Sequence, residues 1–562
     1  MRRTAAALST VLAVTMAGTG AARAEPEPGT AACGTPATHE IAQVQGTGAA
    51  TPLNGQTVRV EGVVTGDFQA AGELKGFFVQ DPTPDADPRT SDGLFVYSTR
   101  AVSPGDRVLV TGRAVEFGGL TELSPVTAVD VCGGGNVRAQ AARLPMDGAE
   151  REAREGMLLR YGQRLTATET YQLGRYGELT VSAGGRLFQP TGGHGSTQEE
   201  NDRRRLLIDD GSTVQNPDDV PFTTPRAVRV GDSAAGVTGV LSEGFGSHRL
   251  QPTRTPRFAR TNPRPPRPAR VGGDVKVASF NTLNWFTTLD RRGADTAGEQ
   301  ERQLAKLVAA LRGLDADAVG LMEVENNGDT AIKALVDRLN AAAGAGTYSW
   351  IRHPNPGTDE IHVSLIYKSA KLRPVGAARS SDDPVFDRPP LVQAFQGRTG
   401  APFTMIVNHF KSKGCDGATG PDRDQGDGQG CFNARRVGQA RAIAGLAAGE
   451  RQPMVLGDLN AYSAEDPVKV LAAAGLASQT ERYVRPAQRY SYVFDGQSGE
   501  LDHLLAGREL ARRITGATIW HINADEPLIL DYNTEYNPAG LYRPDAYRSS
   551  DHDPVLVGLR LR

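Results

Sequence analysis

The alternation of hydrophobic and polar positions divides the chain into two kinds of sequence. From about residue 51 to residue 131, short runs alternate apolar and polar positions with a period of two, as half-buried β-strands do. Turn-forming residues such as Pro104-Gly105-Asp106 separate these runs. Residues 30–135 are therefore predicted to form a small closed β-barrel, and a less regular version of the pattern predicts a second β-rich module over residues 136–259.

The pattern changes after residues 260–272, where repeated prolines and arginines predict an extended linker. Beyond it, apolar runs alternate with stretches of helical periodicity, so residues 273–562 are predicted to form one large layered α/β domain. Strands are expected at 275–280, 318–322, 361–367, 403–408, 454–456 and 555–561, and helices at 301–314, 435–448 and 467–474.

The strand pattern of residues 30–135 resembles an OB-fold. Small barrels of this kind often bind oligonucleotides or oligosaccharides, but a fold alone does not establish binding. The formal net charge of -3 does not identify an anionic or a cationic partner either, so only local patches of charge can be argued.

The first 24 residues have the features of a secretory signal peptide. Arg2 and Arg3 precede an apolar run over residues 5–17, and Ala22-Arg23-Ala24 is an A-x-A cleavage site. The run is too short to span a bilayer, and no later run approaches that length, so the sequence predicts a secreted protein without a membrane span.

Four cysteines fit an exported protein. Cys33 and Cys132 flank the first module, and Cys415 and Cys431 flank one loop rich in glycine and aspartate, so pairing within each couple is expected among the three connectivities that four cysteines allow. Metal binding by these thiols is the alternative, although no C-x-x-C spacing occurs.

Polar side chains cluster where the predicted strands of the last domain end. Each alone could be a capping amide, an exposed acid or a turn residue. Together they place carboxylates, amides and two histidines at the ends of buried strands, where layered α/β proteins bind ligands. They are Asn281, Glu323, His409, Asp458, Asn460, Asp502, Asp551 and His552.

The motifs around these residues resemble those of the endonuclease/exonuclease/phosphatase superfamily, whose best-known member is pancreatic deoxyribonuclease. The resemblance covers residues 271–562 and is closest to bacterial extracellular deoxyribonucleases of the ExeM/NucH type, in which an OB-like module precedes the nuclease domain. The ordered motifs include Phe280-Asn281, Met322-Glu323, Asn408-His409, Gly457-Asp458, Leu501-Asp502 and Ser550-Asp551-His552, and the closer match adds residues 414–433, 490–495 and 520–527.

This resemblance implies a four-layer β-sandwich flanked by helices and a Mg²⁺-dependent phosphodiester hydrolase. Mg²⁺ takes few protein oxygens, which suits Glu323 as the principal ligand with Asn281 and Asp551 nearby. Mn²⁺ is an alternative ion. His552 is then the general base and Asp502 orients it.

The remaining catalytic roles concern the phosphate. Asp458 and Asn460 are expected to position the phosphate or the attacking water. His409 is expected to donate to a phosphate oxygen or to protonate the leaving oxygen, and its expected carboxylate partner is Asp359, with Glu360 as the alternative.

The loop at residues 416–430 carries four aspartates among glycines. It either binds a structural Ca²⁺ or forms a solvated loop closed by a disulfide, and the second interpretation is favoured because the spacing is not that of an EF-hand. Side chains that flank the loop are expected to contact backbone phosphates: Lys411, Lys413, Arg435 and Asn433.

The sequence thus predicts a secreted, monomeric, metal-dependent nuclease that hydrolyses DNA with little sequence preference, with RNA as an alternative substrate. Two other hypotheses remain open. The first is a phosphomonoesterase or a sphingomyelinase-like phosphodiesterase of the same superfamily. The second is a secreted nucleic-acid-binding protein without catalytic activity.

Overall fold

The computed structural model describes residues 33–561. The chain divides into two compact units, and each is described by itself. Their segments are Met1–Gly162, Asp209–Val214 and Gly236–Thr255 for the first unit, and Gln163–Ile208, Gln215–Ala235 and Pro256–Arg562 for the second. The predicted signal peptide, residues 1–24, lies outside the described residues.

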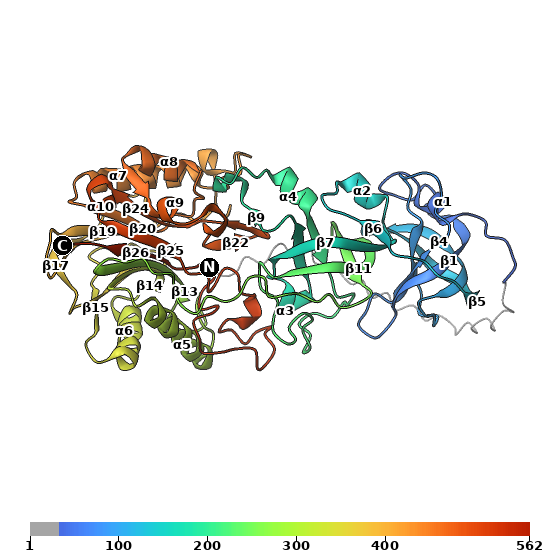
Figure 1. The fold of residues 1–562 in the computed structure, drawn as a ribbon, viewed down its shortest axis with the longest axis horizontal. Coiled ribbons are helices and arrows are strands. Elements are labelled where there is room, and N and C mark those ends of the chain that lie inside the picture. The colour runs from blue at the N-terminus through green and yellow to red at the C-terminus, as the bar shows by residue number, and fades with distance from the viewer. Residues whose placement is uncertain (1–32, 562) are drawn as a thin grey trace. The chain divides into compact units, whose positions relative to one another are not determined.

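A closed five-stranded barrel forms the core of the first unit, which confirms the predicted barrel. Its strand order is β1-β2-β3-β5-β4, and β1, β4 and β5 are labelled in Figure 1. Apolar side chains of all five strands share one buried core. The elements are α1 (Ile41–Gln45), β1 (Thr57–Phe68), β2 (Gly76–Gln80), β3 (Gly93–Tyr97), β4 (Asp106–Phe117) and β5 (Leu120–Gly134).

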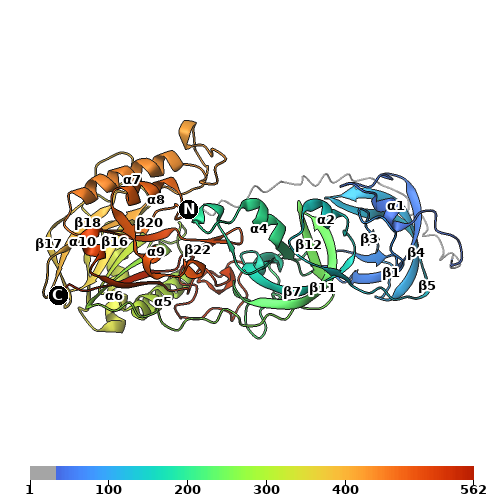
Figure 2. The same cartoon turned by 45° about the horizontal axis from the view of Figure 1, so that its top comes forward.

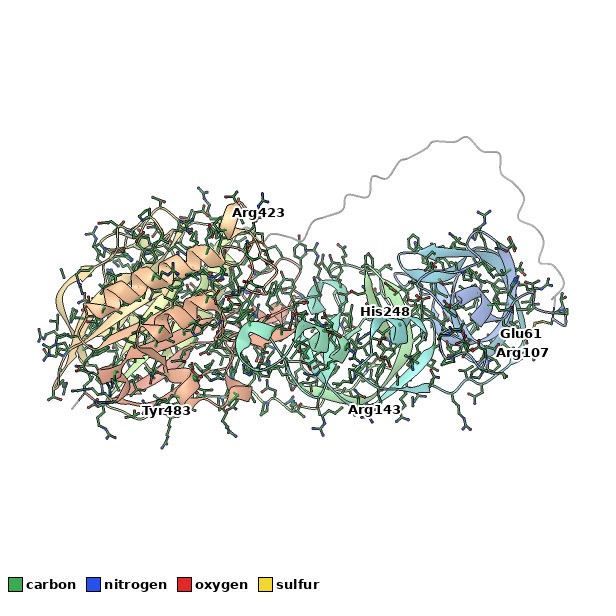
Figure 3. All side chains as sticks on the ribbon, turned by 90° about the horizontal axis from the view of Figure 1, so that it is seen from above. Glu61, Arg107, Arg143, His248, Arg423 and Tyr483 are labelled. Atoms are coloured by element: carbon green, nitrogen blue, oxygen red, sulfur yellow. A yellow bond between two sulfur atoms is a disulfide. The ribbon has the colours of Figure 1, made fainter. Side chains whose placement is uncertain are left out.

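A disulfide and an ion pair connect neighbouring segments of this barrel. The Cys33–Cys132 bond joins the chain before α1 to β5, as predicted. On the surface, Arg107 Nε of β4 lies 3.5 Å from Glu61 Oε1 of β1 (Figure 3). The exposed ion pair contributes little to stability compared with the apolar interior.

The rest of the first unit holds short β-rich segments. The ladder between β11 and β12 runs from Gly239 opposite Pro252 to Gly244 opposite Ser247. The division between the units falls inside β7 and near the start of β11. These elements are β6 (Gln140–Ala142), α2 (Gly148–Glu152), β7 (Leu158–Glu169), β11 (Ser233–Gly244) and β12 (Ser247–Pro252).

Two six-stranded sheets form the centre of the second unit. One has the order β15-β16-β14-β13-β26-β25 and the other β17-β18-β19-β20-β24-β21. The strands of the first are β13 (Val275–Trp285), β14 (Ala318–Glu325), β15 (Tyr348–Ile351), β16 (Ile361–Lys368), β25 (Ile514–Ile519) and β26 (Val555–Leu559). Those of the second are β17 (Leu372–Arg379), β18 (Leu391–Gly397), β19 (Phe403–His409), β20 (Pro453–Asp458), β21 (Leu476–Ser478) and β24 (Asp502–Gly507).

The two sheets face each other, and helices cover their outer faces (Figures 1 and 2). Side chains of both sheets, such as Val277 and Val407, share one apolar core between them. A second core joins the first sheet to α5 and α6, and a third joins the second sheet to α7 and α8. The helices are α5 (Ala297–Leu314), α6 (Thr330–Ala343), α7 (Asn433–Ala448), α8 (Asp466–Ala473), α9 (Gln479–Tyr483) and α10 (Arg508–Ala511).

The predicted strands and helices of residues 273–562 are all present, with most bounds shifted by a few residues. The predicted helix at 301–314 begins earlier, at Ala297, because Thr296 caps it and forms a capping box with Glu299. Local side-chain hydrogen bonds therefore set a boundary that apolar periodicity alone places one turn too late.

A smaller β-rich segment in the second unit packs against the α/β domain. Strand β9 pairs with the hairpin of β22 and β23 in a three-stranded sheet. The strands of this sheet are β9 (Leu187–Phe188), β22 (Tyr492–Phe494) and β23 (Gln497–Gly499). The other short elements of the second unit are α3 (Leu173–Tyr176), β8 (Leu179–Ala183), η1 (Pro190–Gly192), α4 (Gln198–Arg204), β10 (Arg205–Ile208), η2 (Gly420–Asp422), η3 (Pro486–Gln488) and η4 (Leu528–Leu530).

The segment predicted as a linker is held by the α/β domain. Arg264 Nη2 lies 2.6 Å from Glu526 Oε2, and the Trp520 indole N–H donates to the carbonyl oxygen of Pro265. Among residues 33–561, no helix has the length and apolar character needed to cross a membrane.

Candidate active site

Strand register brings the predicted catalytic residues of the second sheet together. His409 ends β19, Asp458 ends β20 and Asp502 begins β24. In the ladders, His409 pairs with Asp458 and Asp458 pairs with Asp502, so the three side chains stand in one row across three neighbouring strands.

The first sheet contributes its residues to the same place. Asn281 in β13 pairs with Met322 in β14, directly before Glu323, and His552 lies three residues before β26. Contacts between the sheets close the site. The Asn281 Nδ2 atom lies 3.1 Å from Glu323 Oε1 and 3.4 Å from Asp458 Oδ2.

A buried histidine and carboxylate form the centre of the site. His552 Nδ1 lies 2.7 Å from Asp502 Oδ2, and the Tyr492 ring packs against the imidazole with the ring centres 4.6 Å apart and the planes tilted by 31°. The hydrogen bond to Asp502 directs a proton to Nδ1 and leaves Nε2 free to accept one. This geometry is that of an oriented general base.

The charge on His552 is controlled by its neighbours. Burial of the ring alone would lower the pKa of His552. The carboxylates of Asp502, Asp458 and Asp551 outweigh burial and raise that pKa well above its usual range. Asp551 itself is half-buried, and its Oδ1 lies 3.4 Å from Ser550 Oγ.

Asp458 lies between the two histidines. Its Oδ2 is 3.4 Å from His409 Nε2 and 3.9 Å from His552 Nε2. Burial would raise the pKa of Asp458, but the two imidazoles outweigh it and hold the pKa well below the usual range. Its Oδ1 accepts the backbone N–H of Asn460 at 2.8 Å. Asp458 is therefore an ionised acceptor at the centre of the site.

Glu323 offers the carboxylate best suited to a divalent cation. Its Oε1 lies 4.0 Å from His409 Nε2, and its Oε2 accepts the backbone N–H of Asn284 at 3.0 Å. In the described part of the chain, neither Glu323 nor Asp458 contacts a lysine or arginine. The uncompensated negative charge and hard oxygen donors fit Mg²⁺ or Mn²⁺ held by Glu323 and Asn281.

Two site residues have unusual backbone conformations. Glu323 has φ 63° and Asn460 has φ 45°, a left-handed region that non-glycine residues seldom adopt. Glu323 lies inside β14, where the pairing with β16 shifts register, and Asn460 lies two residues after β20. Such strain persists where surrounding contacts over-determine it, as in functional sites.

The prediction that Asp359 pairs with His409 is wrong. Asp359 Oδ2 lies 3.3 Å from Arg388 Nη1, and its Oδ1 lies 3.4 Å from Arg292 Nη2. The alternative, Glu360, also binds Arg292. The carboxylate beside the His409 imidazole is Asp458, because the parallel pairing of β19 with β20 places the two residues opposite each other.

Asp359 supports the site indirectly through Arg388. The buried Arg388 guanidinium donates to the backbone carbonyl oxygens of His409 and Phe410. Asn460 Nδ2 also donates to the Phe410 carbonyl oxygen, at 3.1 Å. The chain after β19 is therefore fixed from two sides.

Sequence reasoning missed three residues that hold the His552–Asp502 pair. Ser491 Oγ accepts the backbone N–H of Asp502 at 3.0 Å, and the Asn523 side chain donates to the His552 carbonyl oxygen at 2.6 Å. The Tyr492 ring packs against the His552 imidazole at a tilt. All three belong to the segments 490–495 and 520–527 that carry the closer family resemblance, which was the available signal.

The four residues predicted to contact phosphate already have partners inside the protein. Lys413 Nζ binds both oxygens of Glu465, and Arg435 Nη2 lies 2.9 Å from an oxygen of Asp387. Asn433 Nδ2 donates to Asp466 at 3.3 Å. Lys411 lies 3.9 Å from Asp387 and over the Phe432 ring, so it has the weakest ionic partner of the four.

The loop at residues 416–430 is closed by the predicted Cys415–Cys431 disulfide. Its carboxylates stabilise turns: Asp424 accepts the N–H of Gly426 and Asp427 accepts that of Gln429. Arg423, on the same loop, is labelled in Figure 3. Among residues 33–561, the groups of three or more closely spaced metal-donor side chains are Glu152 with Glu243 and His248, and Asp295 with Glu299 and Glu535; they include neither this loop nor Glu323.

Gly457, directly before Asp458, is required by close packing. It has φ 136°, and a Cβ placed there would lie 1.9 Å from the Asn408 carbonyl oxygen. Gly457→Ala is therefore expected to lower the free energy of unfolding by more than about 2 kcal/mol. The control is Gly445→Ala in α7, where a Cβ meets nothing within 4 Å. Urea unfolding should leave the control at least as stable as the wild type, and a Gly457→Ala variant of equal stability would contradict the account.

Comparison with protein families agrees with this geometry. Residues 279–552 match the profile of the Endonuclease/Exonuclease/phosphatase family. This region is an Endonuclease/Exonuclease/phosphatase family domain. The family consists of phosphoesterases that generally use divalent metal ions. Residues 147–262 match a domain of unknown function (DUF8508). Curated proteins gave no match.

Comparison with solved structures found matches that cover about half of the chain. A family protein from Bacteroides thetaiotaomicron is 17% identical with a TM-score of 0.36, and covers 50% of this chain and 96% of its own. D. rerio TDP2 complexed with single-strand DNA product is 13% identical with a TM-score of 0.33, over 50% and 97%. The human Nocturnin catalytic domain is 17% identical with a TM-score of 0.33, over 52% and 98%.

Proposed function

We propose that this protein is a secreted, metal-dependent nuclease that hydrolyses phosphodiester bonds of DNA with little sequence preference, with RNA as an alternative substrate. The observation that carries the proposal is the buried His552–Asp502 pair, 2.7 Å apart, whose free Nε2 faces Asp458. The motif resemblance to bacterial extracellular deoxyribonucleases of the ExeM/NucH type supports the substrate class. Two disulfides are consistent with an extracellular protein.

The residues divide the reaction between them. His552 Nε2 takes the proton of the attacking water, and Asp502 holds the ring in the required tautomer and stabilises the imidazolium that results. Asp458 and Asn460 orient the water and the phosphate. His409 donates to the leaving oxygen. Glu323 and Asn281, with Asp551 as the third expected ligand, would hold a divalent ion, which would supply charge neutralisation at the phosphate.

The test compares substrates with the purified full chain. Plasmid DNA, RNA, bis(p-nitrophenyl) phosphate, p-nitrophenyl phosphate and sphingomyelin are incubated with Mg²⁺, Mn²⁺, Ca²⁺ or EDTA. We expect metal-dependent cleavage of the polynucleotides and the diester, and no cleavage in EDTA. Turnover confined to p-nitrophenyl phosphate would favour the phosphomonoesterase alternative. Turnover confined to sphingomyelin would favour the sphingomyelinase-like phosphodiesterase. Binding of DNA without any turnover would favour the non-catalytic alternative.

A further inference from the structure

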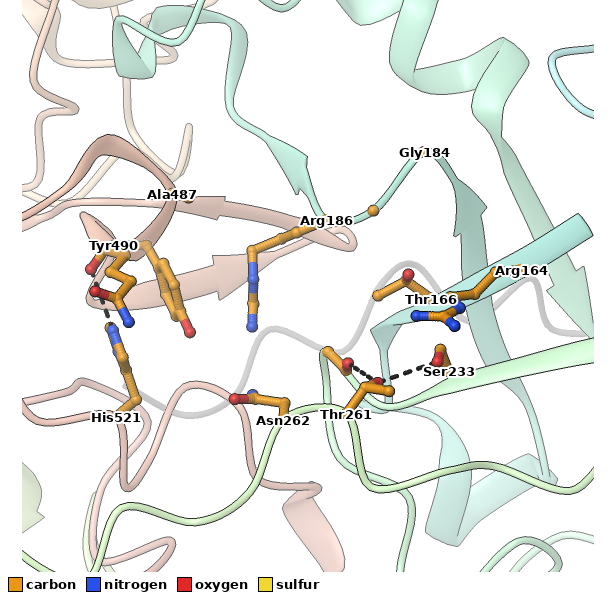
Figure 4. Close-up of a pocket in the computed structure, with 13 residues that line it drawn as sticks. Arg164, Thr166, Gly184, Arg186, Ser233, Thr261, Asn262, Ala487, Tyr490 and His521 are labelled. Carbon is orange, nitrogen blue, oxygen red and sulfur yellow. Dashed lines mark hydrogen bonds between the residues drawn. The ribbon is translucent and has the colours of Figure 1, made fainter.

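A polar cavity lies in the second unit, beside the active site. Its volume is about 520 Å³, and none of the described residues that line it is an aspartate or glutamate. Arginine, histidine and hydroxyl side chains surround it (Figure 4). They include Arg164, Arg186, His521, Thr166, Ser233 and Thr261. A cavity lined by cationic and donor groups without a carboxylate is suited to an anion.

The two arginines differ in their availability to a ligand. Arg186 is fixed inside the wall: its guanidinium lies 2.8 Å from Asp525 Oδ1 and 4.1 Å from the centre of the Tyr490 ring. Arg164, on β7, is exposed, and no ion pair or hydrogen bond involves its side chain among the described residues. Its guanidinium points into the cavity (Figure 4). Arg164 is therefore the positive charge that remains free to bind a ligand.

Hydroxyl groups lie on the same side as Arg164. Thr261 Oγ1 is 3.1 Å from Ser233 Oγ and donates to the Gly231 carbonyl oxygen (Figure 4). Thr261 has one hydroxyl proton for these two acceptors, so when it donates to Ser233 Oγ, the Ser233 hydroxyl can turn its own proton toward a ligand. A guanidinium beside a hydroxyl is a common arrangement for binding phosphate oxygens.

The opposite wall is continuous with the catalytic pair. The Tyr490 and His521 rings stack 4.0 Å apart, and His521 Nδ1 lies 2.8 Å from Asp553 Oδ2. Asp553 follows His552 in the chain, and the next residue after Tyr490 is Ser491, which holds the backbone of Asp502. The cavity wall is thus linked to the general base by the contact of His521 with Asp553 and by the peptide bond between Asp553 and His552.

We propose that this cavity binds a phosphate group of the nucleic-acid substrate away from the scissile bond, with Arg164 as its main cationic contact. The cavity volume lies within the range of nucleotide-sized ligand sites, so it also holds the attached sugar or base. This inference rests on the proposed nuclease activity and deepens it, because it identifies a second substrate contact supplied by the β-rich segment that precedes the catalytic domain.

The experiment compares Arg164→Glu with Arg451→Glu in the full chain. Arg451 is exposed in the loop before β20, at the end of that strand opposite Asp458. Binding of a fluorescein-labelled single-stranded 12-mer is measured by anisotropy in EDTA, with inorganic phosphate and a 5′-mononucleotide as competitors. Steady-state hydrolysis is measured with the unlabelled 12-mer and with bis(p-nitrophenyl) phosphate.

Arg164→Glu is expected to weaken 12-mer binding about tenfold or more and to raise KM for the 12-mer with little change in kcat, since it removes ground-state binding. The Arg451→Glu control should match the wild type. If the mononucleotide displaces the 12-mer, the cavity binds a terminal phosphate. If neither inorganic phosphate nor the mononucleotide displaces it, the cavity binds a phosphate within the strand. Equal binding and equal KM in the two variants would overturn the proposal.

Failure of the proposed function has a different result. If the wild type binds the 12-mer but does not cleave it, the nuclease activity is excluded, whereas the dependence of binding on Arg164 still decides whether the cavity holds phosphate. A circular-dichroism spectrum and melting temperature equal to those of the wild type are required for each variant. Arg164→Gln is the second variant, and it should show a smaller loss of binding than charge reversal.

Discussion

Replacement of His552 by alanine is expected to lower kcat for DNA hydrolysis by about 10³-fold, because the variant lacks the group that accepts the proton of the attacking water. The ring is buried between Asp502 and Tyr492, and its Nε2 faces Asp458, so no neighbouring group described in the structure can take over as a base of similar pKa. The measurement is single-turnover cleavage of plasmid DNA at saturating Mg²⁺.

The matched control is His39→Ala. His39 lies in the first unit, and its ring contacts only the neighbouring Thr38 among the described residues. This variant should cleave DNA at the wild-type rate. A His552→Ala protein that is folded and retains wild-type kcat would show that His552 is not the general base.

The pH profile gives a second reading of the same residue. His552 acts as a base only when neutral, so activity is lost as the pH falls through its pKa, and the carboxylates around it place that pKa above the usual histidine range. Asp502→Asn removes one of these charges. The ascending limb of kcat/KM should therefore move to lower pH in this variant, although its maximal rate also falls because the tautomer is no longer fixed.

Replacement of Glu323 by glutamine is expected to weaken metal binding by about 100-fold and to lower activity in parallel at limiting Mg²⁺. The Glu323 carboxylate lies next to the Asn281 amide, and its basic partner is His409, at 4.0 Å. Glutamine preserves the shape and can still accept the N–H of Asn284, so the variant should fold.

Isothermal titration with Mn²⁺ measures the affinity directly, and Mg²⁺ should raise the melting temperature of the wild type but not of the variant. The control is Glu360→Gln, an exposed acid that pairs with Arg292. Unchanged Mn²⁺ affinity in Glu323→Gln, together with full activity, would contradict the assignment of Glu323 as the metal ligand.

Local sequence was sufficient for the elements and for most of the candidate site. Apolar periodicity located the strands that become β13, β14, β19 and β20, and the polar residues at their ends were chosen because layered α/β folds expose strand ends. The barrel and both disulfides followed from period-two alternation and from which cysteines flank one module or one loop.

The errors and omissions have one physical cause: they concern pairs of residues whose proximity depends on strand order. Asp359 lies just before β16, whereas His409 ends β19, and these two strands belong to different sheets. The Asp359 carboxylate binds Arg388 and Arg292 instead. Asp458 is beside His409 because β19 and β20 are parallel neighbours in register. No local pattern encodes that register.

The sequence alone identified the candidate site residues, since the types and order of Asn281, Glu323, His409, Asp458 and His552 are local properties of the chain. Only the tertiary structure decided how they act. The pairing of the strands, the raised pKa of His552, the left-handed backbone of Glu323 and the cavity beneath Arg164 all arise from contacts between distant segments. Burial and sheet register set these properties, and both are long-range consequences of folding.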